Sequence, residues 1–110
     1  MLMRTMRTIH LAEEFSPFPF GRYPEHGPWS GQKFRDEVLV PALQGGEDIV
    51  VDLDGAHGLS PSFLEETFGG LVRSGFSETD LKRHLKIKSD RDPTYASLIA
   101  VYIRSAATAA

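Results

Sequence analysis

The residues whose types and spacing could support chemistry are grouped in one short stretch, DLDGAHGLSPS. Asp52 and Asp54 are two positions apart, so on a strand they point to the same side and could share a metal ion or a proton. His57 could complete a ligand set or act as a base, and Ser60 or Ser62 could be a nucleophile if His57 reached it. A small metal-dependent hydrolase using Asp52, Asp54 and His57 is therefore one hypothesis.

Structural roles for these side chains are the simpler interpretation. Asp54 precedes a glycine, a pair typical of turns in which the carboxylate accepts backbone N–H groups. The chain contains no GxSxG, HExxH, P-loop or GxGxxG motif. It also has no cysteine, which excludes thiolate-metal sites and disulfides. We therefore predict no catalytic residue, no metal site and no cofactor, and we expect a protein that is not an enzyme.

A strand and a helix are predicted on either side of this stretch. Residues 49–53 have the continuous apolar pattern of a central strand with neighbours. A helix is predicted to begin at Ser60 or Ser62, either of which can cap it, with Pro61 in its first turn and Gly75 at its end. In open α/β sheets, ligands and partners meet the chain beyond the carboxyl ends of central strands, which is where this turn lies.

The predicted helix has one apolar face and contains two glycines. Its apolar positions are Phe63, Leu64, Thr67, Phe68, Leu71 and Val72. Glu65, Glu66 and Arg73 are predicted on the opposite side. Gly69 and Gly70 each cost roughly 1 kcal/mol relative to alanine inside a helix. We interpret them as sites of close packing against the sheet or a neighbouring helix.

The rest of the chain completes an α/β pattern. We expect strands at 8–11 and 85–88, and helices at 30–43, 77–84 and 92–104. Pro41 is predicted to kink or end the first of these helices, because proline removes one backbone hydrogen bond. The pattern indicates a single domain over residues 1–110, with the ends 1–6 and 105–110 frayed.

Residues 15–29 form a segment rich in aromatic residues and proline, which we call the aromatic loop. It holds five of the eleven aromatic residues and four of the seven prolines, so it cannot be a regular helix. Such a segment either covers the core or exposes a recognition surface. We favour the core cover, because a small domain needs large apolar groups to complete its core.

Composition excludes some classes of partner. The net charge of −3 and the pI near 5.7 argue against a general nucleic-acid-binding protein, which needs a dense basic face. The basic cluster is short and is interpreted as a solvated surface; it consists of Lys82, Arg83, His84, Lys86 and Lys88. No stretch approaches the roughly 18 apolar residues of a membrane span. We therefore expect a cytoplasmic protein with no membrane or nucleic-acid partner.

Three segments in combination resemble a known family. FGRYPEHGPWSGQKFRDEVLVPAL, then VVDLDG, then SPSFLEETFGGLV are similar to the STAS-like family of small bacterial proteins of unknown function, which resemble the STAS domains of anti-sigma-factor antagonists. The similarity extends over roughly residues 8–104. It implies a small mixed β-sheet with about four helices on one side, and so an α/β fold of STAS type.

The resemblance also implies a function. It points to a regulatory or protein-interaction module that docks a partner, such as a kinase-like ATPase or a sigma-factor regulator, through residues 52–66. The residues implied in docking or phosphorylation are Asp54, His57, Ser60, Ser62, Glu65 and Glu66. In antagonist STAS domains a phosphorylated serine follows an aspartate at the helix start, whereas Pro61 stands at that serine position here. A small-ligand sensor, or a homo-oligomer in contact through the aromatic loop, is a third hypothesis.

Overall fold

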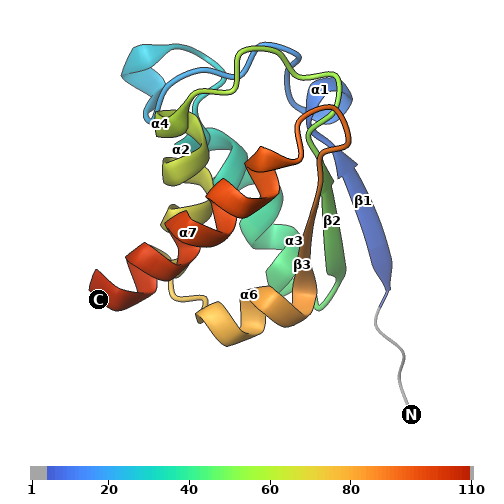
Figure 1. Ribbon diagram of the computed structural model, residues 1–110, viewed down its shortest axis with the longest axis vertical. Helices are drawn as coiled ribbons and strands as arrows, with labels where there is room; N and C mark the ends of the chain where they lie inside the picture. The colour runs from blue at the N-terminus through green and yellow to red at the C-terminus, as the bar shows by residue number, and fades with distance from the viewer. Residues whose placement is uncertain (1–4, 110) are drawn as a thin grey trace.

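The computed structural model describes residues 5–109, which form one sheet and a set of helices (Figure 1). In chain order the elements are β1 Met6–His10, α1 Leu11–Glu14, η1 Pro24–His26, α2 Gly31–Phe34, η2 Arg35–Leu39, α3 Val40–Gln44, β2 Asp48–Asp52, α4 Pro61–Leu64, η3 Glu65–Gly69, α5 Gly70–Arg73, α6 Glu78–His84, β3 Leu85–Lys88 and α7 Thr94–Ala109. The α/β class predicted from the sequence is confirmed. None of the helices in this range is long and apolar enough to span a membrane.

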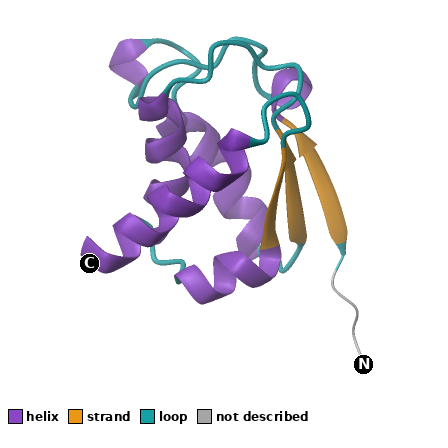
Figure 2. Cartoon of the chain, viewed as in Figure 1, coloured by secondary structure: helices purple, strands orange, loops and turns teal. Residues whose placement is uncertain are grey.

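The sheet has the order β1-β2-β3, and both of its strand pairs are parallel. The prediction of a mixed sheet is corrected in this respect for residues 5–109, since each connection between strands is a helical crossover. Figure 2 shows the helices gathered on one side of the strands. The register places His10 beside Asp52 and Asp52 beside Lys88, so the carboxyl ends of the three strands lie level at the same end of the sheet. The turn after β2 leaves the sheet at this carboxyl end.

The core lies between the sheet and the helices. Ile9, Ile49 and Val51 point from the strands into it and are at most 1% exposed. From the helices, Phe34 and Phe63 stack with their ring centroids 6.3 Å apart. The opposite face of the sheet has no helical cover in the described chain, and its strand residues are more polar. This explains why β2, predicted to be apolar on both faces, buries only one face fully.

Two helices that we predicted as regular α-helices each contain a π-helical turn. The helix of residues 31–44 runs through η2, and the helix of residues 61–73 runs through η3. Pro41 does not end the first helix, which continues to Gln44. Pro41 is the second residue after η2, at whose end the Val40 N–H bonds to the Arg35 carbonyl five residues back. The wider turn absorbs the local mismatch that a proline creates inside a helix.

Several boundaries differ from those predicted, and β2 is shifted by one residue, to Asp48–Asp52 instead of 49–53. β1 begins at Met6 rather than residue 8 and ends at His10. α7 continues to Ala109, beyond the predicted end at residue 104, and Ala106 is buried. The five extra residues are mostly alanine, which has the highest helix propensity and favours continuation. The predicted frayed ends fall partly on residues 1–4 and 110, which lie outside the described range.

Candidate functional site

The carboxyl ends of the three strands bring together a histidine, an aspartate and a lysine. Asp52 Oδ2 lies 3.1 Å from His10 Nδ1 and 3.9 Å from Lys88 Nζ. Its other oxygen accepts the backbone N–H of Asp54 at 2.9 Å. The Asp52 carboxylate is thus fully engaged in joining the three strand ends and starting the turn. The register of the sheet dictates this grouping, and sequence spacing alone could not show it.

Asp54 fastens this turn to the loop between β3 and α7. Its carboxylate accepts the backbone N–H groups of Arg91 at 3.0 Å and Asp90 at 3.1 Å, and it pairs with Lys88 Nζ at 3.2 Å. The hydrogen bond from the Arg91 backbone, followed by those from Asp90 and Lys88, lowers the pKa of Asp54. The structural interpretation of Asp54 as a turn residue agrees with this geometry, which adds a long-range loop contact.

His57 lies on the surface against the aromatic loop. Its ring stacks on that of Phe18 with centroids 5.4 Å apart, and its backbone N–H bonds to the Pro17 carbonyl at 2.8 Å. Phe18 is 66% exposed and Phe20 is 61% exposed. The loop therefore does not serve mainly as the core cover that we favoured. Phe15 alone among its rings packs against the core cluster.

Ser60 is the residue that caps the second long helix. Its Oγ accepts the backbone N–H of Phe63 at 3.2 Å, and Pro61 occupies the first turn as predicted. Ser62 is the second residue of α4, and its Oγ lies 3.2 Å from Ser60 Oγ. Both serines are partly exposed. The pattern had left the choice of cap open between them, and the structure selects Ser60.

Glu65 and Glu66 occupy different environments, contrary to the prediction that both lie opposite the apolar face. Glu65 is partly exposed and is held by Arg22 at 2.6 Å and Arg73 at 2.9 Å. The Arg73 hydrogen bond is the largest influence lowering the pKa of Glu65. Glu66 is buried, with 6% exposure, so it cannot contribute to a docking surface. Glu66 is three residues after the buried Phe63, and residues three apart on a helix lie on the same face, so its burial follows from helix geometry.

Glu66 is the centre of a charged contact between the two π-containing helices. Arg35, itself only 9% exposed, donates through one nitrogen to Glu66 Oε2 at 2.5 Å and to the Glu66 carbonyl at 2.9 Å. Burial disfavours the charged guanidinium, but hydrogen bonds to Asp36 and Glu66 outweigh it and raise the pKa of Arg35. Sequence reasoning missed this pair. The sequence held one indication of it: Arg35 is four residues before the apolar Leu39, so on a helix the two residues lie on the same face.

The glycines of the second helix make room for these charges. A Cβ added at Gly70 would lie 2.2 Å from Arg35 Nη1, and one added at Gly69 would lie 2.3 Å from Glu65 Oε2. The close backbone approach predicted at Gly69 and Gly70 is not found there; it occurs instead at Gly31, where an added Cβ would lie 2.8 Å from the Phe63 carbonyl. Gly70 therefore accommodates a neighbouring side chain rather than a neighbouring backbone.

The three residues of the hydrolase hypothesis are not arranged as a ligand set. Asp52 and Asp54 are committed to the contacts described above, and His57 is stacked on Phe18. Within residues 5–109, no cluster of three or more histidine, aspartate or glutamate side chains is placed to hold a metal ion. The turn instead offers a surface built from a partly exposed helix start, His57 and the exposed rings beside it.

Comparison with models of known protein families gives a match. The profile of a STAS-like domain of unknown function (DUF4325) matches residues 30–95, which is more than half of the chain. The matched span contains both π-helical turns, β2, the turn after it and β3. Neither the search of curated proteins nor the search of solved structures finds a match.

Proposed function

The chain belongs to the family of STAS-like domains of unknown function, and from this premise we propose that it is a regulatory, non-catalytic module that docks a protein partner. The docking face comprises the partly exposed part of the strand-turn-helix region 52–66 together with the aromatic loop beside it. The partner class that the STAS likeness suggests is a kinase-like ATPase or a sigma-factor regulator. The proposed setting is the cytoplasm.

The exposed aromatic rings are the observation that carries this proposal. Phe18 and Phe20 are both more than half exposed, and Tyr23 and Trp29 are 40% and 39% exposed. Such a concentration of apolar rings is unfavourable in water and is typical of surfaces that become covered by another protein. Phe18 stacks on His57, so the loop and the turn present one continuous surface. Aromatic side chains also supply much of the energy at interfaces between proteins.

Within this face, Ser62 is the proposed site of regulation by phosphorylation. The Ser60 oxygen already accepts the Phe63 N–H, so modification there would disturb the cap. The Ser62 hydroxyl contacts only the Ser60 hydroxyl in the described chain and lies in the first turn of a helix. Negative charge is favourable at a helix N-terminus, so a phosphate on Ser62 is compatible with the fold while changing the charge of the docking face.

The test compares two surface substitutions of the same kind. The double variant Phe18→Ser/Phe20→Ser removes the rings of the docking face, and Met6→Ser removes an apolar side chain that is 68% exposed on the edge strand β1. Both variants and the wild type are cross-linked in the source cells, and the captured proteins are identified. We expect one partner to be captured by the wild type and by Met6→Ser but lost with the double variant.

Regulation is tested separately with Ser62→Asp and Ser62→Ala. Affinity for the captured partner is measured by titration calorimetry, and we expect the aspartate variant to bind more weakly than the alanine variant. Equal capture by the wild type and by the Phe18→Ser/Phe20→Ser variant would contradict the docking face. Equal affinities of the two Ser62 variants would contradict the switch but not the docking.

A further inference from the structure

The outer edge of β3 is an unpaired strand edge. Within residues 5–109, β3 pairs only with β2. The Lys88 carbonyl accepts the Leu53 N–H, so Lys88 and Lys86 direct their backbone groups toward β2. Because adjacent residues of a strand alternate, the Ile87 N–H and C=O point to the open side. An unpaired edge of this kind is a template for one more strand.

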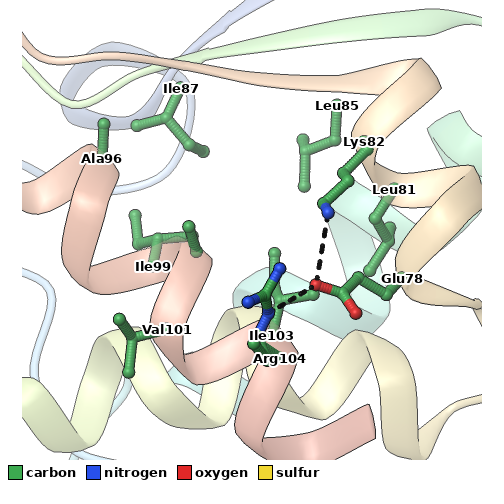
Figure 3. A pocket seen from close by; sticks show the side chains of 11 residues that line it. Glu78, Leu81, Lys82, Leu85, Ile87, Ala96, Ile99, Val101, Ile103 and Arg104 are labelled. Atoms are coloured by element: carbon green, nitrogen blue, oxygen red, sulfur yellow. Dashed lines mark hydrogen bonds and ion pairs between the residues drawn. The ribbon is translucent and has the colours of Figure 1, made fainter.

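An apolar groove lies beside this edge, between β3, α6 and α7 (Figure 3). Its volume is about 390 Å³, and its walls include Leu85 and Ile87 from β3 and Ile99, Val101 and Ile103 from α7. Val101 is 56% exposed. α7 packs mainly on η3 and α5 and runs away from β3, as Figure 1 shows. Leu85 and Ile99 are buried in the floor of the groove, whereas Ile87, Val101 and Ile103 remain partly or largely exposed. A strand added to β3 would direct every second side chain into this groove.

The other face of the same edge carries one exposed cation that is unpaired within residues 5–109, Lys86, because Lys88 is paired with Asp52, Asp54 and Asp90. Lys86 and Lys88 lie on the open side of the sheet, opposite to Leu85 and Ile87. Residues 78–88 contain four lysines or arginines against two acidic residues, a formal charge of +2 in a chain whose net charge is −3. An acidic side chain on an added strand would pair with Lys86.

We propose that the β3 edge binds an extended segment of another protein in which apolar and acidic residues alternate. The segment adds as a fourth strand, its apolar side chains fill the groove beneath α7, and an acidic side chain lies beside Lys86, the lysine of this edge that has no acidic partner within residues 5–109. Backbone hydrogen bonds supply affinity, and the alternation supplies specificity. This surface is separate from the docking face around residues 52–66, so each proposal can be tested and rejected without affecting the other.

The charges favour such a partner over a second copy of this chain. Two β3 edges related by a two-fold axis would place Lys86 and Lys88 against the same lysines of the partner copy. Like charges on neighbouring strands are destabilising. The lysines therefore act against self-pairing of the edge and favour a strand of opposite charge.

The test uses a fluorescein-labelled hexapeptide of alternating valine and glutamate, with a valine–lysine hexapeptide as its charge-reversed control. We expect fluorescence polarisation to show at least about tenfold tighter binding of the glutamate peptide, since reversing the charge replaces attraction with repulsion along the strand. Hydrogen exchange followed by NMR should show the Ile87 amide slowed on binding, which is a sign of strand addition that binding elsewhere would not give.

Three variants locate the site, each checked by circular dichroism for an unchanged fold. Lys86→Glu should weaken binding of the glutamate peptide about tenfold and improve binding of the lysine peptide. Lys33→Glu changes the net charge equally on α2 and should have little effect. Ala100→Trp fills the groove and should abolish binding. The proposal is overturned if no binding of the glutamate peptide is detected, if both peptides bind equally, or if Ile87 exchange is unchanged in the complex.

Discussion

The polar turn after β2 and the charged contact between the two π-containing helices use polar side chains in different ways. In the turn, Asp52 bonds to an N–H two residues away and Ser60 to one three residues away. Between the helices, Arg35 reaches Glu66, 31 residues along the chain, and both are nearly buried. The polar groups of the turn combine these local contacts with long-range ones, from Asp52 to His10 and from Asp54 to the backbone of the β3–α7 loop, whereas the helix contact is a single buried ion pair that defines how two helices pack.

The helix contact also gives a reason for the position of the π turns. Arg35 is the first residue of η2, and Glu66 is the second of η3, so each π turn carries one member of the ion pair. A π turn rotates the following side chains and frees backbone carbonyls from the regular pattern. The Glu66 carbonyl accepts from Arg35 at 2.9 Å. We infer that the two π turns and the ion pair are one packing unit.

Breaking the buried ion pair should give the largest effect. Removing one member of a buried pair costs about 3–5 kcal/mol. In Arg35→Leu the Glu66 carboxylate keeps Arg22 at 3.4 Å and Arg73 at 3.6 Å, so the cost should lie at the lower end of this range. We expect the free energy of unfolding, measured by urea titration, to fall by an amount in this range. The fall should exceed that of any single substitution in the turn.

The double variant Arg35→Leu/Glu66→Leu is the control for this prediction. Replacing both members by apolar residues leaves no uncompensated charge, so most of the lost stability should return. A double variant that is as unstable as Arg35→Leu would show that the charges are not the cause. The stability contributed by the helix contact would then come from the packing of the Arg35 and Glu66 side chains and not from their charges.

Gly70→Ala should lower the free energy of unfolding when Arg35 is present and raise it when Arg35 is absent. The added Cβ would lie 2.2 Å from Arg35 Nη1, and this nitrogen cannot move without losing Glu66. Overpacking of this kind costs about 1–3 kcal/mol. In an Arg35→Ala background the clash disappears, and the helix propensity of alanine should instead add up to about 1 kcal/mol. Urea titrations of the four proteins measure both values, and equal losses in the two backgrounds would refute the assignment.

The same contrast explains what the sequence could predict. The helix start at Ser60 with Pro61, the strand predicted at residues 49–53 and the turn at Asp54 rest on local preferences. The structure has the helix start and the turn, and its strand is shifted by one residue to Asp48–Asp52. Glu66 was placed on the wrong side, because the pattern assigned charged residues to the exposed face although Glu66 lies three residues after the buried Phe63. The parallel sheet and the Arg35 contact depend on pairings across more than thirty residues, which local patterns do not encode.

Removing the helix cap should give an intermediate effect confined to the turn. Ser60→Ala deletes the acceptor of the Phe63 N–H, and loss of such a cap costs typically about 1 kcal/mol. Ser62→Ala removes a hydroxyl that caps no N–H, so it should change the free energy of unfolding by less than half as much. Equal losses from the two substitutions, measured by urea titration, would show that the two hydroxyls work as one unit.

The smallest effect should come from Glu65, the partly exposed carboxylate beside the buried pair. Its hydrogen bond from Arg73 lowers its pKa in the folded protein below the ordinary 4.5, so its contribution to stability is complete above pH 4.5 and is lost as the pH falls below that value. Because Arg73 is exposed, we expect Glu65→Gln to lower the free energy of unfolding at pH 7 by less than about 1 kcal/mol. The difference between wild type and variant should shrink toward pH 3, and an Arg73→Gln background should reduce it at pH 7. A difference that stays constant with pH would assign the effect of Glu65 to packing, and the ionic part of the helix contact would then be limited to the buried pair.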